Sequence, residues 1–182
     1  MKIDRSEVDL DAIDLALLTL LQENCKRPMA ALGNEVGLSA PSVVERIHKL
    51  EEAGVIAGYT AQLNARRVGK DVAAFIGVSV GHPTQIDAFE REVVRFPDVL
   101  ECHHVTGGYT LMLKVKVANT AELERLIDRI RAVAGVTRTE TMVVLSTQAE
   151  RSQIALPVPE GAPAERGRRG TQARPRRTLR RA

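Results

Sequence analysis

The chain has 182 residues, of which 44% are hydrophobic and 27% charged, a balance typical of a globular protein with one sizeable domain or two small ones. No apolar run approaches the roughly 20 residues that a membrane-spanning helix needs, and the acidic N-terminal stretch MKIDRSEVDLDAIDL is unlike a signal peptide. The two cysteines lie far apart in the sequence, which argues against a disulfide framework and favours a reducing cytoplasm.

The net charge of +3 is unevenly distributed along the chain. Residues 157–182 contain eight arginines and two glutamates, whereas the residues before them carry a net charge of −3. This segment is also rich in Pro, Gly and Ala and has no hydrophobic period, so we expect residues 151–182 to form a basic, disordered tail. The tail is either a solvated charge run or a non-specific phosphate-binding arm, and so many arginines favour the arm.

Three helices are predicted in residues 1–64. Asp11 is a typical N-cap for the first helix, Asp14 follows in its first turn, and Pro28 lies just beyond its end. A short second helix is predicted over residues 29–36, and Gly37 supplies the turn after it. The buried stripe of the first helix consists of Ile13, Leu17, Leu20 and Leu21.

The third helix lies in the stretch GLSAPSVVERIHKLEEAG, residues 37–54, and begins at Ser39 or Ala40. Val43, Ile47 and Leu50 recur at the spacing of a buried helical face. The following stretch VIAGYTAQL, residues 55–63, indicates a β-hairpin. Helix, short helix, glycine turn, helix and hairpin together are typical of a winged helix-turn-helix.

In a helix-turn-helix, the last helix enters the DNA major groove with its N-terminal residues nearest the bases. The small, hydroxyl-bearing start of this helix suits such an approach, and its basic residues suit phosphate contacts. For any single residue, helix capping or a solvated surface is an equally good explanation, but the combination favours DNA. The predicted DNA-binding residues are Ser39, Pro41, Ser42, Arg46, His48 and Lys49.

The net charge of the predicted helix-turn-helix module indicates that other parts of the protein contribute to DNA binding. Residues 1–64 carry six basic and ten acidic side chains, a net charge of −4. Five of the acids lie at or before the start of the first helix, where they could face away from DNA. Affinity then has to come from a local basic patch, from several modules acting together, or from the tail.

Residues 65–70, ARRVGK, indicate a hinge, after which residues 71–150 alternate strand and helix patterns. The order βαββαβ is that of a ferredoxin-like fold, an antiparallel sheet with two helices on one face, so the whole chain is predicted to be an α+β protein. Strands are predicted over 71–80, 99–105, 110–117 and 136–146, and helices over 84–96 and from a capping box at Asn119 onward.

The chain resembles the Lrp/AsnC, or feast/famine, transcriptional regulators of bacteria and archaea. The resemblance runs from about Leu10 to Thr147 and is carried by LDAIDLALLTLLQEN and by AALGNEVGLSAPSVVERIHKLEEAGVIAGYTAQLN. The long motif GLS-x-P-x-V-x-x-R-I-x-x-L-E-x-x-G-V-I-x-G-Y-x-A makes the resemblance specific.

This resemblance implies a sequence-specific DNA-binding regulator that is not an enzyme and has neither a cofactor nor a metal. Residues 71–150 would form the family's RAM-type domain, which pairs sheet against sheet into a homodimer and assembles further, often to an octamer. A small effector, commonly an amino acid, would bind between these domains. The protein would act on double-stranded DNA in the cytoplasm, at the nucleoid, and not at a membrane.

Carried onto this chain, the resemblance places the effector-binding residues in a glycine-containing turn and in the last strand. Many relatives have acids at the positions of Gly108 and Thr110, and this chain has neither, although an ammonium group calls for a counter-charge. Glu101 is the nearest acid in sequence. An amino-acid effector, a different ligand and no ligand therefore all stay open. The implied residues are Gly107, Gly108, Tyr109, Thr110, Thr139 and Thr141.

Two other functions compete with regulation. Some decarboxylases of sirohaem-type tetrapyrroles resemble this same two-domain architecture, and His103 and His104 would then be candidates for catalysis. With Cys102 these histidines also suggest a metal, but no second cluster supplies the remaining ligands. A nucleoid-type architectural protein is the third alternative. The hydroxyl-bearing third helix and the arginine tail favour the regulator.

Overall fold

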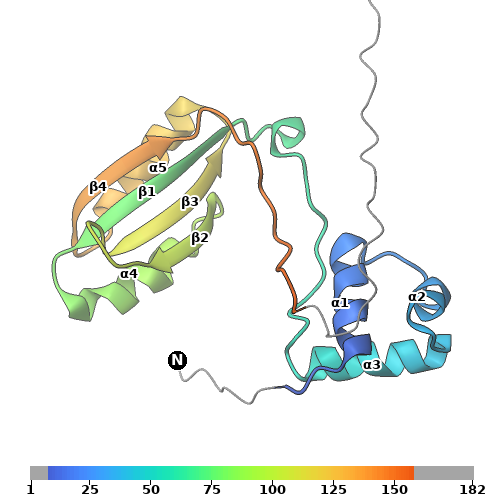
Figure 1. Ribbon diagram of the computed structural model, residues 1–182. Coiled ribbons are helices and arrows are strands. Elements are labelled where there is room, and N and C mark those ends of the chain that lie inside the picture. The colour runs from blue at the N-terminus through green and yellow to red at the C-terminus, as the bar shows by residue number, and fades with distance from the viewer. Residues whose placement is uncertain (1–7, 158–182) are drawn as a thin grey trace, which may run out of the picture. The chain divides into compact units, whose positions relative to one another are not determined.

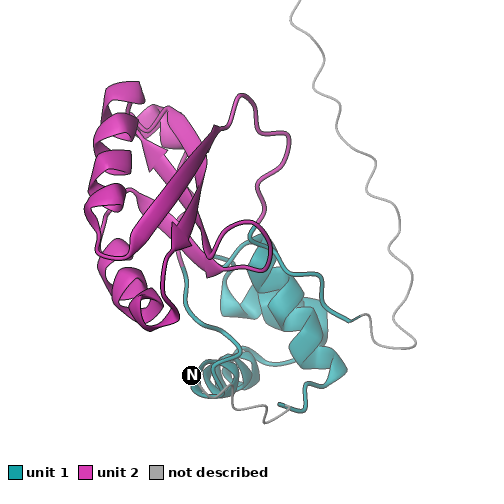
Figure 2. Ribbon diagram, turned by 90° about the vertical axis from the view of Figure 1, so that its left-hand side faces the viewer, with its two compact units in different colours: residues 1–59, 152–182 teal, residues 60–151 magenta. Residues whose placement is uncertain are grey.

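A computed structural model describes residues 8–157, which divide into two compact units (Figure 2). The helical unit contains the chain up to Tyr59 and the segment that begins at Ser152, and the sheet unit is Thr60–Arg151. The arginine-rich part of the predicted tail, from residue 158, lies outside the described residues. Within residues 8–157, no helix is long and apolar enough to cross a membrane.

The helical unit contains α1 (Ala12–Glu23), α2 (Met29–Val36) and α3 (Ala40–Glu52), which confirms the three predicted helices (Figure 1). The predicted cap of α1 is reciprocal. Asp14 N–H donates to the Asp11 carboxylate at 2.8 Å, and Asp11 N–H donates to the Asp14 carboxylate at 3.2 Å. Gly37 ends α2 with a positive φ of 73°, the left-handed conformation that glycine adopts without strain.

The core of the helical unit is formed by the predicted apolar stripes. A close approach of backbone sets the turn between α2 and α3. Leu38 N–H donates to the Gly33 carbonyl at 2.8 Å, and a Cβ on Gly33 would collide with the carbonyl oxygen of Leu38. The buried cluster consists of Leu17, Leu21, Leu32, Val43 and Ile47.

The predicted hairpin over residues 55–63 is wrong, because none of these described residues forms a strand. The N–H groups of Val55 and Ile56 instead donate to the Leu50 carbonyl and close the end of α3. The Tyr59 hydroxyl donates to Glu51 at 2.8 Å, and burial, followed by this hydrogen bond, raises the pKa of Tyr59 to about 12. The two halves of the expected hairpin belong to different units, since the division falls after Tyr59, so they do not pair.

Residues 152–157 complete the helical unit at α1. The Gln22 side-chain amide binds the backbone of Ile154 twice, accepting from its N–H at 2.7 Å and donating to its carbonyl at 3.1 Å. Gln153 adds a third hydrogen bond, from its side chain to the Gln22 carbonyl at 2.9 Å. We call these contacts the Gln22 clamp.

The sheet unit confirms the predicted βαββαβ order, with all neighbouring strands antiparallel. Its strands lie in the order β2 (Val99–His104), β3 (Leu111–Val117), β1 (Val72–Val80) and β4 (Val136–Val143). The helix predicted over 84–96 is shorter than expected and follows a single 3₁₀ turn, η2 (Pro83–Gln85). The predicted hinge contains another such turn, η1 (Ala65–Val68). The helices of this unit are α4 (Ile86–Val93) and α5 (Thr120–Ala132).

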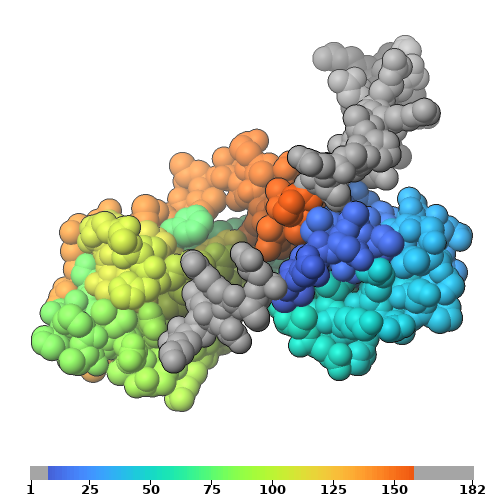
Figure 3. Space-filling model, turned by 60° about the horizontal axis from the view of Figure 1, so that its bottom comes forward, coloured from blue at the N-terminus to red at the C-terminus, as the bar shows by residue number. Residues whose placement is uncertain are grey.

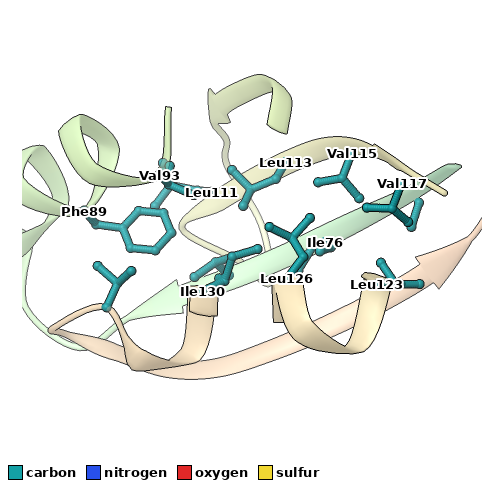
Figure 4. Close-up of a cluster of buried hydrophobic side chains, with 13 residues drawn as sticks. Ile76, Phe89, Val93, Leu111, Leu113, Val115, Val117, Leu123, Leu126 and Ile130 are labelled. Carbon is teal, nitrogen blue, oxygen red and sulfur yellow. The ribbon is translucent and has the colours of Figure 1, made fainter. Parts of the chain in front are cut away.

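One face of the sheet is covered by α4 and α5, and the core lies between this face and the two helices (Figure 4). Along β3, Leu111, Leu113, Val115 and Val117 are buried against the helices, while the residues between them point the other way. We call that second surface the open face. Among the described residues it carries Phe75, Gly77, Met112, Lys114, Lys116, Glu140 and Met142.

Candidate nucleic-acid interface and effector loop

The predicted hydroxyls lie together at the first turn of α3. Ser39 is the N-cap, and its Oγ accepts a hydrogen bond from Ser42 N–H at 3.3 Å. The two hydroxyl oxygens are 2.8 Å apart and share one hydrogen bond. Each Ser Oγ retains further capacity, because a hydroxyl has one proton and two lone pairs. Pro41 occupies the same exposed turn, so three of the predicted residues are grouped.

Arg46 lies elsewhere, on the side of α3 that faces the start of α1. Its Nη1 is 2.7 Å from an Asp11 oxygen and 2.8 Å from an Asp14 oxygen, so one guanidinium closes the capping box of α1. The Asp14 backbone N–H, followed by Arg46, lowers the pKa of the Asp11 carboxyl. The structure therefore places Arg46 in contact with two carboxylates, where a phosphate contact was predicted. The sequence signal for this ion pair was the presence of two acids, Asp11 and Asp14, at the N-cap of α1.

The remaining predicted residues project outward from α3, which forms part of the outer surface in Figure 3, in cyan to teal. Lys49 pairs with Glu45 at 2.8 Å and His48 with Glu52 at 3.4 Å, each one helical turn apart. Such solvent-exposed pairs contribute little to stability, so Lys49 can exchange its partner for a phosphate at small cost.

One exposed residue of this surface was missed by sequence reasoning. Val44 follows the buried Val43, yet it is 51% exposed. With Pro41 and His48 it lines a shallow hollow on the outward side of α3. The signal was available, because residues 41, 44 and 48 follow one another at helical spacing on one face.

The predicted effector turn joins β2 to β3 and is anchored on β1. Thr110 N–H donates to the Val78 carbonyl at 2.9 Å, and the Thr110 hydroxyl accepts from Val80 N–H at 3.1 Å. Gly107 has a φ of 123°, which residues with a side chain rarely adopt. The turn thus has a fixed base and a glycine-dependent tip.

Tyr109 extends from this turn over the open face of the sheet. Its ring lies against Gly77, where a Cβ would come within 2.7 Å of ring atoms. The Arg138 guanidinium carbon is 6.0 Å from the ring centroid, and Arg138 pairs with Glu140 at 2.7 Å. A hydrogen bond with Glu140 raises the pKa of Tyr109. An aromatic ring, a cation and a carboxylate are therefore gathered at one place.

The two predicted threonines of β4 lie on the opposite side of the sheet. Thr139 pairs with Val78 and Thr141 with Ile76, whose side chains are buried against the helices. Arg131 of α5 donates to the Thr139 hydroxyl at 2.8 Å. Within one chain the structure therefore does not bring these threonines together with Tyr109. Glu140, between them in sequence, was missed, although strand alternation directs it to the open face.

The other acid considered for an effector is already engaged. Glu101 pairs with Lys114 at 2.9 Å and with His103 at 3.2 Å. Lys114 also binds Glu150 at 2.7 Å, and Lys116 binds the second Glu150 oxygen at 2.8 Å. Hydrogen bonds from Lys114 and then Lys116 lower the pKa of the Glu150 carboxyl to about 2. The chain after β4 is thus held on the open face.

The histidines of β2 have different surroundings. His103 lies on the open side, as its pairing with Met112 requires, whereas His104 pairs with the buried Leu111. Cys102, directly before them in the sequence, contacts the core, and burial raises the pKa of its thiol to about 11. In the described part of the chain, no three His, Cys, Asp or Glu side chains form a group that could hold a metal ion.

Comparison with known proteins agrees with this two-unit architecture. Residues 10–51 match the AsnC-type helix-turn-helix domain, and residues 73–154 match the Lrp/AsnC ligand binding domain. The HTH-type transcriptional regulator FL11 of Pyrococcus horikoshii is 32% identical over 82% of this chain and 98% of its own length. The leucine-responsive regulatory protein of Rhizobium meliloti is 34% identical over 82% of this chain and 97% of its own length.

Solved structures give the same result. A feast or famine regulatory protein from M. tuberculosis, complexed with L-methionine, has a TM-score of 0.76 and 33% identity, covering 80% of this chain and 99% of that one. A transcriptional regulator from Neisseria meningitidis, also in complex with L-Met, has a TM-score of 0.77 and 27% identity, covering 81% and 97%. The chain belongs to the Lrp/AsnC family of transcriptional regulators, and its helical unit is a DNA-binding helix-turn-helix.

Proposed function

We propose that this regulator binds operator DNA through the outward surface of α3. The observation that carries the proposal is the division of α3 into two sides. Val43, Ile47 and Leu50 are buried, whereas Ser39, Pro41 and Lys49 are exposed and Ser42 is half-buried. Ser39, Pro41 and Ser42 would approach the bases, and Lys49 and His48 would contact the backbone.

In this proposal Arg46 has a different role from the one that the sequence suggested. Its guanidinium holds α3 against the cap of α1, so it positions the helix and leaves phosphate contacts to other cations. Arg46 then partly neutralises the acids at the start of α1, while the net charge of residues 1–64, which already counts Arg46, stays at −4.

The test is fluorescence anisotropy with DNA from the region upstream of the protein's own gene. Ser42→Ala and Lys49→Ala should each weaken binding by about 3- to 10-fold, while Lys26→Ala, a change of an exposed cation outside α3, should leave it unchanged. Equal affinity of all three variants and the wild type would exclude this surface. Loss of residues 158–182 should flatten the salt dependence of binding without changing the preferred site.

We also propose that a small zwitterion, of the amino-acid class, regulates the protein through the sheet unit. Two relatives were solved with L-methionine. Arg138 and Glu140, beside Tyr109, offer one charge for the carboxylate and one for the ammonium group of an amino acid. Glu140 would supply the negative charge that many relatives have at the positions of Gly108 and Thr110. Calorimetric titration with the twenty amino acids tests this, with Glu140→Gln expected to weaken the binding. Twenty flat traces would leave another ligand or none.

Dimerisation through the open face is the third part of the proposal. Phe75 and Met142 are 39% and 41% exposed there and pair across β1 and β4, an apolar pair that a second sheet would bury. Further assembly to an octamer is proposed from family membership. Sedimentation of wild type and Phe75→Asp should show a larger species only for the wild type, and Val94→Asp, a change at an exposed valine outside the sheet, is the control.

The proposed regulator works in the cytoplasm, at the nucleoid, without a cofactor and without catalysing a reaction. The relatives compared above are named as transcriptional regulators, which supports regulation over decarboxylation of a tetrapyrrole. Binding without any sequence preference would instead favour the architectural role.

A further inference from the structure

The outward side of α3 carries an apolar strip that the fold of the chain does not use. Pro41 and Val44 are one turn apart on this side, and Ala40 borders the same hollow. Val44 is 51% exposed, although its neighbour Val43 is completely buried. A β-branched residue is a slightly unfavourable choice for an exposed helix position, so helix stability does not explain the valine.

The strip lies in the part of the helix that goes deepest into the groove. In a helix-turn-helix, the N-terminal residues of the recognition helix contact the base edges. Pro41 is in the first turn of α3 and Val44 begins the second. In the major groove, the apolar group that the base pairs present is the C5-methyl of thymine. We propose that Val44, supported by Pro41, determines specificity by contacting a thymine methyl in each half-site.

A protein partner fits this strip less well than DNA. Two side chains offer far less than the roughly 800 Å² that each partner contributes to a standard interface. The strip is also bordered by charged groups, since Glu45 pairs with Lys49 and His48 with Glu52. The hollow is thus lined both by the apolar residues and by these paired side chains, which suits one methyl group among phosphates and base edges.

This inference rests on the proposed contact between α3 and DNA, and its test separates the two. The preferred site is first selected from random duplexes with the full-length protein. Each thymine of that site is then replaced singly by deoxyuridine, which removes only the C5-methyl group. We expect one replacement in each half-site to weaken binding by about fourfold, the effect of burying one methyl.

Val44→Ala should weaken binding to the selected site and abolish the sensitivity to that replacement. The two changes remove the same contact, so their effects should not add. The matched control is Val94→Ala, a change at an exposed valine of the sheet unit, which should keep the full sensitivity. Because alanine favours helix, Val44→Ala should melt no earlier than the wild type, which separates lost contact from lost fold.

The outcomes discriminate among the claims. Sensitivity to deoxyuridine that survives in Val44→Ala, or a selected site in which no methyl matters, overturns the role of Val44 and leaves DNA binding by α3 intact. A selection that yields no preferred site overturns the proposed function, and the specificity claim is then overturned with it.

Discussion

The two units of this molecule differ in how the residues considered for function are distributed. In the helical unit they lie on one helix, so a single period of about 3.6 residues assigns each to a side. In the sheet unit they come from a turn and from β4, and the side of each depends on strand register. Tyr109 consequently lies on the open face while Thr139 faces the helices. Functional residues that lie on one element are thus easier to predict from the sequence than those contributed by several elements.

The most disruptive change to the helical unit should be Gly33→Ala. An added Cβ would meet the carbonyl oxygen of Leu38, which is backbone and cannot rotate away. We expect a loss of about 3 kcal/mol in the unfolding free energy of this unit, measured by hydrogen exchange of α1 and α3 amides. Asn34→Ala, at the adjacent exposed position, is the control. Equal protection in both variants would mean that the turn adapts.

In the sheet unit, Gly77→Ala should move Tyr109 from its place. The new methyl would come within 2.7 Å of the ring, and the flexible side chain would yield, at a cost of about 1–2 kcal/mol. We expect the Tyr109 ring resonances to shift and effector affinity to fall, while Ser79→Ala on the same strand changes neither. Unchanged ring resonances in Gly77→Ala would contradict the close contact.

Arg46 and Lys49 allow the two sides of α3 to be compared directly. Arg46→Met should destabilise the helical unit by about 1 kcal/mol, because two carboxylates lose their partner, yet keep the salt dependence of DNA binding. Lys49→Met should keep stability and reduce the salt slope by about one. The measurements are thermal melting and binding titrations at several salt concentrations. A reduced salt dependence of DNA binding in Arg46→Met would show that Arg46 does contact phosphate.

The smallest effect should come from Glu150→Gln on the open face. The pKa of the Glu150 carboxyl is lowered from 4.5 to about 2 in the folded chain, so its stabilisation is present above pH 4.5 and is lost as the pH falls toward 2. Since the side chain is 42% exposed, the effect should stay below about 1 kcal/mol. Urea unfolding should separate wild type from variant at pH 6 and less so at pH 3.

Glu124→Gln, a change of an exposed carboxylate on α5, provides the comparison for that titration. A gap between wild type and Glu150→Gln that is as large at pH 3 as at pH 6 would show that the lysines do not act through the Glu150 charge.

Much of the fold was predictable because its signals are local. Capping by Asp11, the bounds of α2 and the alternation along β3 each depend on neighbouring residues, and all three predictions are confirmed. The expected hairpin failed because pairing is not local, and residues 55–63 are shared between two units. The contacts of Arg46 and Glu140 were not predicted for the same reason: their surroundings come from α1 and from the turn before β3.

The Gln22 clamp makes the sheet unit an insertion within the chain of the helical unit. The polypeptide leaves the helical unit after Tyr59 and rejoins it at Ser152, so the regulatory half is fastened at both of its ends. A ligand that alters the sheet unit therefore acts on the DNA-binding half through two connecting segments of the chain instead of one. Near the end of the described residues, Gln153 and Ile154 lie against α1, in the half that reads the operator.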